Sequence, residues 1–237
     1  MRRNRILADL PLATLRRLAP EIQLRQMQLR EQVARRGQPI ADIYFPLTCV
    51  LSTVAEGAAG EVVEVATLGN EGMSGLSVFL GTNGSSTLET YTQVIGESLW
   101  MGSRPFKALL RSEQSLSQTM GRYTEALLTQ ISQASACNRL HTVQERCARW
   151  LLMSHDRVLR DEFELTQEFL AQMLGVRRAS VGAVASGLQR AGVISYVRGN
   201  VIIKDREGLE QRSCECYSII RDEYTRLFPP LNRRRYA

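Results

Sequence analysis

The chain has 237 residues, of which 44% are apolar and 23% are charged, and its formal net charge is +6. These values match soluble globular proteins and exclude disordered, collagen-like and purely coiled-coil chains. No apolar run approaches the roughly 20 residues that a membrane helix needs, and no signal-peptide core follows the basic N-terminus. We therefore expect a cytoplasmic protein of one large domain or two small ones.

Five cysteines, an odd number, indicate free thiols in a reducing compartment rather than a disulfide framework. Only Cys214 and Cys216 are close in the sequence, so the paired clusters of a zinc or iron–sulfur site are missing. The two histidines, His141 and His155, lie outside the strand-rich region described next. From this spacing we expect no metal site and no cofactor.

The first hundred residues combine short helices with strand-like runs. Residues 1–20 carry spaced apolar positions on both sides of Pro11, which predicts short helices. Short β-branched and aromatic runs follow between Ile22 and Met101, and nine glycines separate them. Short runs with frequent turns predict an antiparallel β-sandwich or barrel, with the first helices packed on its end.

Helical spacing begins after Pro105. One apolar seam steps by three or four residues: Leu116, Met120, Tyr123, Leu127, Ile131 and Ala134. This seam packs either on the chain's own barrel or against the same seam of a second copy. A helix of this length, roughly 35 Å, exceeds a barrel of about 100 residues, so we favour homodimerisation. A second helix is predicted at 143–158.

The most informative segment is 165–205. Thr166 is a good N-cap for a helix with an apolar face, and Gly175 is a good residue to end it. A second helix at about 177–191 follows after three or four residues. Its predicted buried positions are Val181, Val184 and Leu188. Such a short turn fits two helices that cross steeply, as in a helix-turn-helix; a purely structural helical hairpin is the alternative.

Two further β-branched runs, 193–197 and 201–203, follow Gly192. They flank Arg198-Gly199-Asn200, whose glycine and asparagine tolerate the positive φ of a tight hairpin. The sequence therefore predicts a β-hairpin wing beside the two helices.

The candidate DNA-contacting residues are Thr166, Gln167, Arg177, Arg178, Ser180, Gln189, Arg190 and Arg198. Arginines at the start of the second helix can bond guanine bidentately in the major groove, one reading a base while the other holds phosphate. The start of the first helix suits the DNA backbone, and the later residues suit phosphate or water. Residues 142–237 carry 16 basic and 12 acidic side chains, against 14 and 12 in residues 1–141, so the basic excess is larger where DNA is expected.

The order of β-barrel, long helix, helix-turn-helix and wing, with the motif LTQEFLAQMLGVRRASVGAVASGLQRAGVI, resembles the Crp/Fnr family of bacterial transcription regulators over residues 5–208. In the barrel, GNEGMSGLSVF at 69–79 resembles the family's cassette. The resemblance implies an α+β chain that acts as a homodimer on a pseudo-palindromic operator. Its expected parts are a cyclic-nucleotide-binding-like jelly roll (1–112), a long dimerisation helix (113–141), a winged helix-turn-helix domain (142–208) and a C-terminal helical extension with a basic tail (209–237). The cassette implies an effector pocket at Gly72, Met73, Ser74 and Gly75.

The barrel departs from family members that bind cyclic AMP, which use a glutamate and an arginine of this region. Ser74 takes the place of the glutamate, and seven acids between Arg36 and Arg104 face no base. A phosphate would lose charge-assisted hydrogen bonds of roughly 1.5–3 kcal/mol each, so we argue against a cyclic nucleotide and leave the effector open. Because no cysteine precedes Cys49, an N-terminal iron–sulfur cluster is not expected.

The second helix also departs from the family pattern. Arg178 resembles the family's first base-reading arginine, but Ala179 and Ala183 replace the next two reading residues. Losing an acceptor for cytosine and a donor for guanine predicts a changed half-site.

Three functions compete. The leading hypothesis is a dimeric, sequence-specific regulator whose partners are double-stranded DNA, a second copy and, as a further candidate, RNA polymerase. The rival is an effector-binding jelly-roll signalling protein that acts through protein partners rather than DNA. A cupin-like enzyme would need metal ligands or a nucleophile–base pair in the barrel; both histidines lie outside it, so we expect no catalytic residues.

Overall fold

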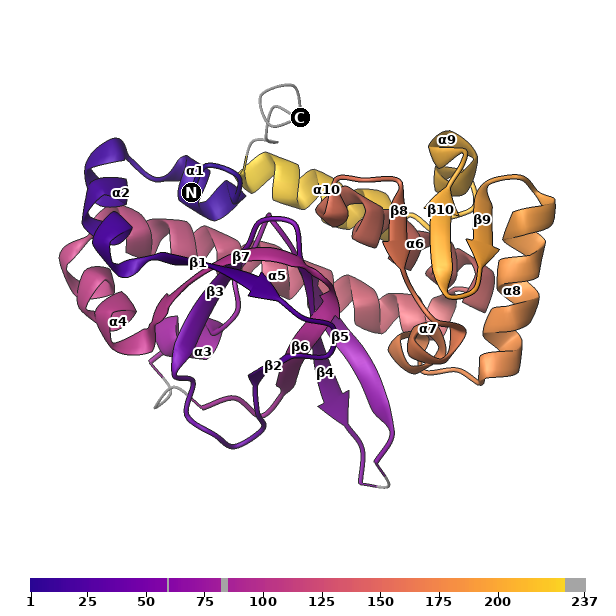
Figure 1. The fold of residues 1–237 in the computed structure, drawn as a ribbon, viewed down its shortest axis with the longest axis horizontal. Helices are drawn as coiled ribbons and strands as arrows, with labels where there is room; N and C mark the ends of the chain where they lie inside the picture. Colours follow the sequence, from indigo (N-terminus) through magenta and orange to yellow (C-terminus); the bar gives the residue numbers. More distant parts are fainter. Residues whose placement is uncertain (59, 82–84, 229–237) are drawn as a thin grey trace.

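The computed structural model describes residues 1–58, 60–81 and 85–228. A β-rich N-terminal domain and a smaller C-terminal domain lie side by side along one long helix (Figure 1). The predicted basic tail at 233–235 lies outside the described residues, and the domain boundaries at 112, 141 and 208 stay predictions. None of the helices in the described ranges has the length and the apolar character that crossing a membrane would require.

The N-terminal domain consists of two antiparallel sheets. Its elements are α1 (Arg5–Asp9), α2 (Leu12–Leu18), the 3-10 turn η1 (Ala19–Glu21), β1 (Gln23–Met27), β2 (Gln32–Ala34), β3 (Asp42–Pro46), β4 (Val50–Glu56), β5 (Val62–Leu68), α3 (Leu76–Phe79), β6 (Glu89–Val94), β7 (Gly96–Gly102) and α4 (Ser103–Ser112). One sheet has the order β1-β7-β3 and the other β2-β6-β4-β5. Apolar side chains fill the interior, where the Phe45 ring meets that of Phe106 from α4 at 6.3 Å between centroids. The predicted jelly-roll barrel is confirmed.

Two short helices close one end of the barrel, as predicted around Pro11. Asn4 caps α1 by accepting a hydrogen bond from the Leu7 amide at 3.3 Å. Ile6 and Leu7 of α1 and Leu15 and Leu18 of α2 are buried in the core, so the amphipathic spacing of this segment covers the barrel.

The helix α5 (Gln114–Leu140) runs along both domains (Figure 1). Leu116, Met120 and Tyr123 have no exposed surface in the single chain, and Leu127 is 8% exposed. The Tyr123 hydroxyl donates to the Met73 carbonyl of the barrel at 2.8 Å. These side chains therefore cannot contact a second copy, and the predicted dimer seam is wrong at these four positions. The alternative holds: the barrel is covered by the more apolar stripe of the helix, because that burial stabilises the single chain most. The seam residues Ile131 and Ala134 are half-buried.

The C-terminal domain begins directly after α5. Its elements are α6 (Val143–Val158), β8 (Glu162–Glu164), α7 (Gln167–Leu174), α8 (Arg178–Arg190), β9 (Ile194–Val197), β10 (Asn200–Ile203) and α9 (Arg206–Glu210). Thr142 and Glu145 form a capping box at the start of α6. The small sheet has the order β8-β10-β9, so the predicted hairpin gains a third strand from the segment before α7.

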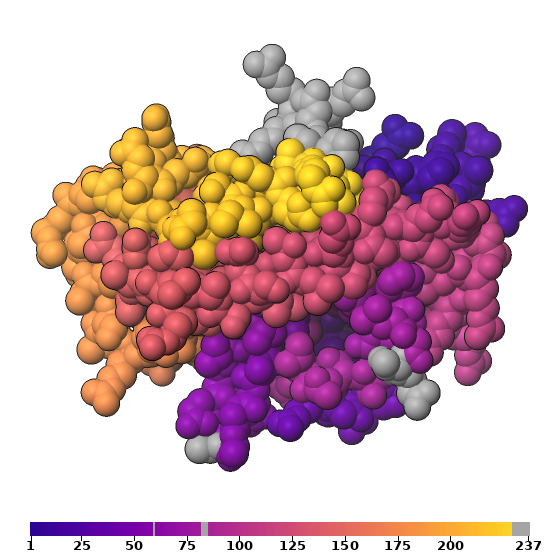
Figure 2. Space-filling model, turned by 180° about the vertical axis from the view of Figure 1, so that it is seen from behind, coloured from indigo at the N-terminus to yellow at the C-terminus, as the bar shows by residue number. Residues whose placement is uncertain are grey.

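The last helix, α10 (Cys216–Leu227), returns from the C-terminal domain along α5 toward the N-terminal helices (Figures 1 and 2). Arg5 of α1 donates to the Tyr224 carbonyl at 2.7 Å and also to the Phe228 carbonyl. The Arg122 guanidinium of α5 lies over the Phe228 ring at 5.3 Å. The predicted C-terminal helical extension thus bridges the two domains.

Candidate nucleic-acid interface

Local signals set the two ends of α7. The Thr166 hydroxyl accepts from the Phe169 amide at 3.1 Å, which satisfies one of the free donors of the first turn. Gly175 ends the helix with φ +62°, and a Cβ there would lie 3.2 Å from Val63 of the barrel. The predicted cap and the predicted helix end are both confirmed.

The helix α8 buries one face and exposes its beginning. Val181, Ala185 and Leu188 are buried; Val184, predicted to be buried, is only partly so, and Ala185 lies on the inner face instead, four residues after Val181. The side chains at the start of the helix, Arg177, Arg178 and Ser180, are exposed.

The reading end of α8 is free of strong internal contacts. Arg178 has one weak ion pair, with Glu168 at 3.9 Å, and the two side chains are 69% and 74% exposed. A pair this exposed contributes little free energy, so a ligand can replace it. Figure 1 places α8 at the edge of the molecule, on the side away from the barrel.

The wing is a tight hairpin. Arg198 and Gly199 both have positive φ, 51° and 80°, as a two-residue turn with right-handed strand twist requires. Tyr196 of β9 donates its hydroxyl to the Leu165 carbonyl at 2.7 Å, which fixes the wing against the start of α7. Arg198 is exposed at the tip.

Gln189 has a role that the sequence did not predict. Its side-chain oxygen accepts from the Tyr196 amide at 2.8 Å, so it joins α8 to the wing instead of facing solvent with a free amide group. The expected phosphate or water contact is corrected to this internal one. Arg190, its neighbour, is exposed and stays a predicted DNA contact.

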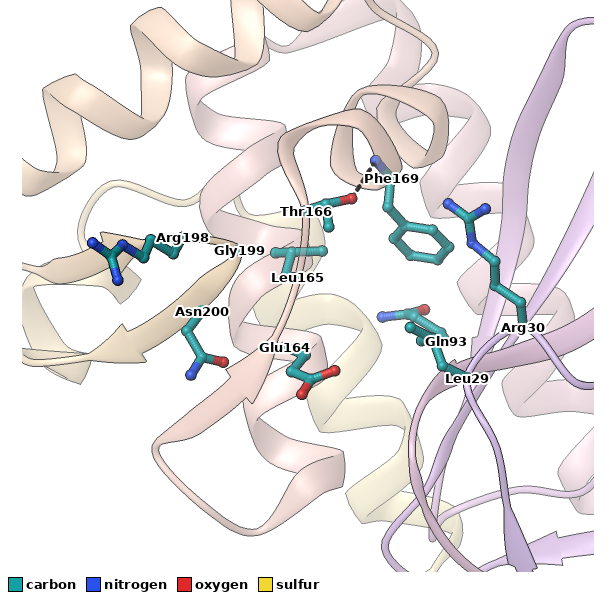
Figure 3. A pocket seen from close by; sticks show the side chains of 10 residues that line it. All are labelled: Leu29, Arg30, Gln93, Glu164, Leu165, Thr166, Phe169, Arg198, Gly199 and Asn200. Atoms are coloured by element: carbon teal, nitrogen blue, oxygen red, sulfur yellow. Dashed lines mark hydrogen bonds between the residues drawn. The ribbon is translucent and has the colours of Figure 1, made fainter.

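A pocket of about 230 Å³ separates the two domains beside this surface. Thr166, Phe169 and Arg198 lie on its C-terminal side, while Arg30 and Gln93 of the barrel lie opposite (Figure 3). In Figure 3 the Phe169 ring and the Gln93 amide both point into this space. Any molecule that filled the pocket would contact the barrel and the helix-turn-helix together.

The four cassette residues do not form a pocket. Gly72, Met73, Ser74 and Gly75 belong to or adjoin the buried core, and a Cβ at Gly72 would lie 2.9 Å from the Tyr123 hydroxyl. The Ser74 hydroxyl accepts from the Tyr44 amide at 3.2 Å, and the Ser74 amide donates to the Tyr44 carbonyl at 2.9 Å. The predicted effector pocket at these residues is wrong, because protein side chains fill the space around them.

The cassette instead carries a buried ion pair between the domains. Arg157 of α6 donates to Glu71 at 2.8 Å, and each side chain is only 6% exposed. The same guanidinium donates to the Met153 carbonyl at 2.7 Å and to the Gln130 side chain at 3.1 Å. Sequence reasoning missed this pair, although an acidic barrel without a base of its own indicated that some acids find a partner elsewhere.

A second carboxylate also joins the barrel to α6. Glu64 of β5 accepts from Trp150 Nε1 at 2.9 Å and from the Thr67 hydroxyl at 2.8 Å, and Ser52 donates to its other oxygen. Burial raises the pKa of the Glu64 carboxyl above its ordinary value, although these hydrogen bonds act in the opposite direction.

This raised pKa predicts a pH-dependent stability. The folded chain holds the Glu64 proton above the pH at which the unfolded chain loses it, about 4.3. The free energy of unfolding therefore falls as the pH rises from about 4 through the raised pKa. We expect Glu64→Gln, which has no proton to lose, to become more stable relative to the wild type as the pH rises.

Urea unfolding at pH values from about 4.5 to about 8 measures this difference. Glu61→Gln, a substitution of the same chemistry at an exposed residue of the barrel, is the control. Parallel stability curves for the wild type and Glu64→Gln would contradict the expectation.

The fold and this surface define a class: a DNA-binding protein with a winged helix-turn-helix whose reading helix exposes two arginines. Residues 145–212 match the family model of the Crp-like helix-turn-helix domain. This domain, on a barrel and long helix of the same family's fold, places the chain in the Crp/Fnr family of DNA-binding transcription regulators. The enzyme hypothesis therefore falls.

Solved structures share the fold over most of the chain. A protein of Eubacterium rectale ATCC 33656 assigned to the Crp/Fnr regulators superposes with a TM-score of 0.67 at 15% identity, over 89% of this chain and 98% of its own. FixK2 from Bradyrhizobium japonicum gives 0.65 at 13% over 81% and 98%. A CRP-family regulator from Thermus thermophilus gives 0.64 at 20% over 80% and 96%. At such identities the likeness establishes the fold. A comparison with curated protein sequences finds no match.

Proposed function

We propose that this regulator reads a two-fold symmetric DNA site as a homodimer, with the start of α8 in the major groove of each half-site. The observation that carries the proposal is the exposure of Arg177, Arg178 and Ser180 at the first turn of α8. An arginine at this place can bond O6 and N7 of a guanine bidentately. Thr166 and Gln167, at the start of α7, suit contacts with the DNA backbone.

A free stripe of α5 supports the dimer. Beside the buried seam, Gly121, Thr124, Leu128, Ile131 and Ser135 step by three and four residues, the spacing of a two-helix contact. Leu128 is 59% exposed, and a Cβ at Gly121 would meet no atom within 4 Å. Figure 2 shows α5 uncovered along its length, between α10 on one side and the barrel on the other.

The dimer thus uses the stripe next to the one that the sequence analysis chose. Small residues at 121 and 135 let two helix backbones approach closely, while Leu128 and Ile131 supply apolar area. Two-fold pairing of this stripe presents two α8 helices to one duplex, whose half-site centres lie about 10 to 10.5 base pairs apart.

The buried cassette supports an effector other than a cyclic nucleotide. A phosphate would have to displace Tyr123 or break the pairing of Glu71 with Arg157, since the carboxylate already neutralises that guanidinium. Calorimetric binding of cyclic AMP or cyclic GMP at micromolar affinity would reject this part of the proposal.

Selection of bound sequences from random duplexes tests DNA reading. We expect enrichment of a two-fold symmetric site. Enrichment of nothing at low salt would instead favour the jelly-roll signalling protein that acts through protein partners.

Two substitutions separate the roles of the side chains. Arg178→Ala is expected to relax specificity at one base pair per half-site, at a cost of about 1–3 kcal/mol, because a bidentate contact to one base is lost. Gln167→Ala, the control at the neighbouring helix start, should weaken all sequences similarly. Equal losses across all sequences for both variants would contradict these assignments.

A further inference from the structure

Four side chains with metal-ligating atoms meet where α10 begins and α5 ends. Cys137 and His141 lie one turn apart at the end of α5, and Cys214 and Cys216 lie at the start of α10. One ligand atom of each residue lies within 4.8 Å of the other three. The two nearest sulfurs, those of Cys137 and Cys214, are 3.4 Å apart, and Cys216 Sγ is 3.6 Å from His141 Nδ1.

We propose that Cys137, His141, Cys214 and Cys216 bind a single Zn²⁺ ion. Zinc takes four ligands in a tetrahedron, with Zn–S near 2.3 Å and Zn–N near 2.0–2.1 Å. The edges of such a tetrahedron are about 3.5–3.8 Å, close to the separations found between these atoms. Three thiolates and one imidazole form a known type of structural zinc site.

The distances argue against two other uses of these thiols. A sulfur separation of 3.4 Å is far longer than the roughly 2.05 Å of a disulfide bond. An iron–sulfur cluster distributes its ligands over two or four irons, so its ligand atoms lie farther apart than four atoms that surround one ion.

Residues around the four ligands fit the charge and the geometry of the site. His141 Nε2 lies 3.2 Å from a Glu215 carboxylate oxygen, and such a carboxylate fixes the tautomer and the ring orientation of a metal-binding histidine. The three thiols are buried, whereas His141 is partly exposed and so provides a path for the ion.

Two buried arginines near the thiols supply the opposite charge. Three thiolates and one Zn²⁺ carry a net charge of −1, and Arg146 and Arg149 both interact electrostatically with Cys137. In the described part of the chain, the Nε atoms of both arginines are buried without a hydrogen-bond partner. A negatively charged centre beside them compensates for this burial.

The prediction of no metal site failed because it used spacing along the sequence. Cys214 is 77 residues from Cys137, and only the packing of α10 against α5 brings the two pairs together. The ion would fasten the start of α10 to the last turn of α5, directly before the turn at His141 that leads into the DNA-binding domain. This site is independent of how α8 reads DNA.

Metal content of the purified full-length protein tests the proposal. After incubation with excess Zn²⁺ and removal of free ion, we expect about one Zn²⁺ per chain. Titration of metal-free protein with Co²⁺ should give the intense visible absorption of a tetrahedral site and a thiolate-to-cobalt charge-transfer band. Zn²⁺ should abolish both signals.

Cys214→Ala combined with Cys216→Ala should lower bound zinc to less than about a tenth of an ion per chain. Cys147→Ser, at a buried cysteine of α6 outside the cluster, is the control and should retain full zinc. Less than about 0.1 Zn²⁺ in the wild type, no tetrahedral cobalt spectrum, or a Cys137–Cys214 disulfide that excludes the ion would each overturn the proposal. The wild-type measurements decide the question even if the double variant does not fold.

Discussion

Arg157→Met is expected to lower the free energy of unfolding by about 3–5 kcal/mol. The substitution keeps a long apolar stem but removes the only charge that the structure shows paired with Glu71 in the described residues. The carboxylate is then buried without a compensating charge, and the Gln130 and Met153 oxygens lose their donor. Urea unfolding, monitored by circular dichroism, measures this loss.

Two further variants separate the buried charge from a general effect of removing an arginine. Arg226→Met breaks an exposed ion pair with Glu125, 2.7 Å long and with side chains 58% and 57% exposed, and should change stability by no more than about 1 kcal/mol. Glu71→Met added to Arg157→Met removes both charges and should recover much of the loss. A double variant no more stable than Arg157→Met would show that the ion pair is not the cause.

Leu128→Glu is expected to turn a dimer into a monomer. The substitution puts a charge on each copy at the centre of the free stripe of α5, where the two carboxylates would face each other in an apolar contact. A monomer engages one half-site at a time and loses the effective concentration of the second, so affinity for the symmetric site should fall by about 10²- to 10⁴-fold. Sedimentation gives the mass and fluorescence anisotropy gives the affinity.

Leu24→Glu provides the matched control. Leu24 lies on β1, is 61% exposed against 59% for Leu128, and lies away from the stripe, so this variant should remain dimeric. Tyr123→Glu, on the buried seam, should unfold the chain rather than release a folded monomer. An unchanged mass for Leu128→Glu would reject pairing through this face.

The sequence predicted the helix-turn-helix and the wing well because their signals are local. Thr166 and Gly175 set the ends of α7 through their own hydrogen bonds and dihedral angles, and Gly199 permits the wing turn beside Arg198. Such signals act over a few residues and need no knowledge of tertiary contacts.

The orientation of α5 was beyond the sequence. Its two stripes repeat with the same spacing and differ by a rotation of one residue, so periodicity alone cannot say which stripe faces the barrel. The more apolar stripe, with Met120 and Tyr123, was assigned to the dimer, yet the barrel needed that surface more. The less apolar stripe around Leu128 remained free.

Contacts between distant segments were also missed. Arg157 and Glu71 are 86 residues apart, and the four zinc-ligand candidates come from two separate helices. Neither set has a signal along the chain beyond an imbalance: acids without bases in the barrel, and cysteines without partners. Only the packing of the helices resolves both.

The path of α10 limits how far the DNA-binding domain can swing. This helix leaves the C-terminal domain, follows α5 and ends at the clasp that Arg5 forms with its last carbonyls. The molecule is therefore tethered at both margins of the junction, through the α5–α6 turn and through this return helix. A large rotation of the reading head must first peel α10 away, so the strength of that strap sets the free-energy threshold for any allosteric movement.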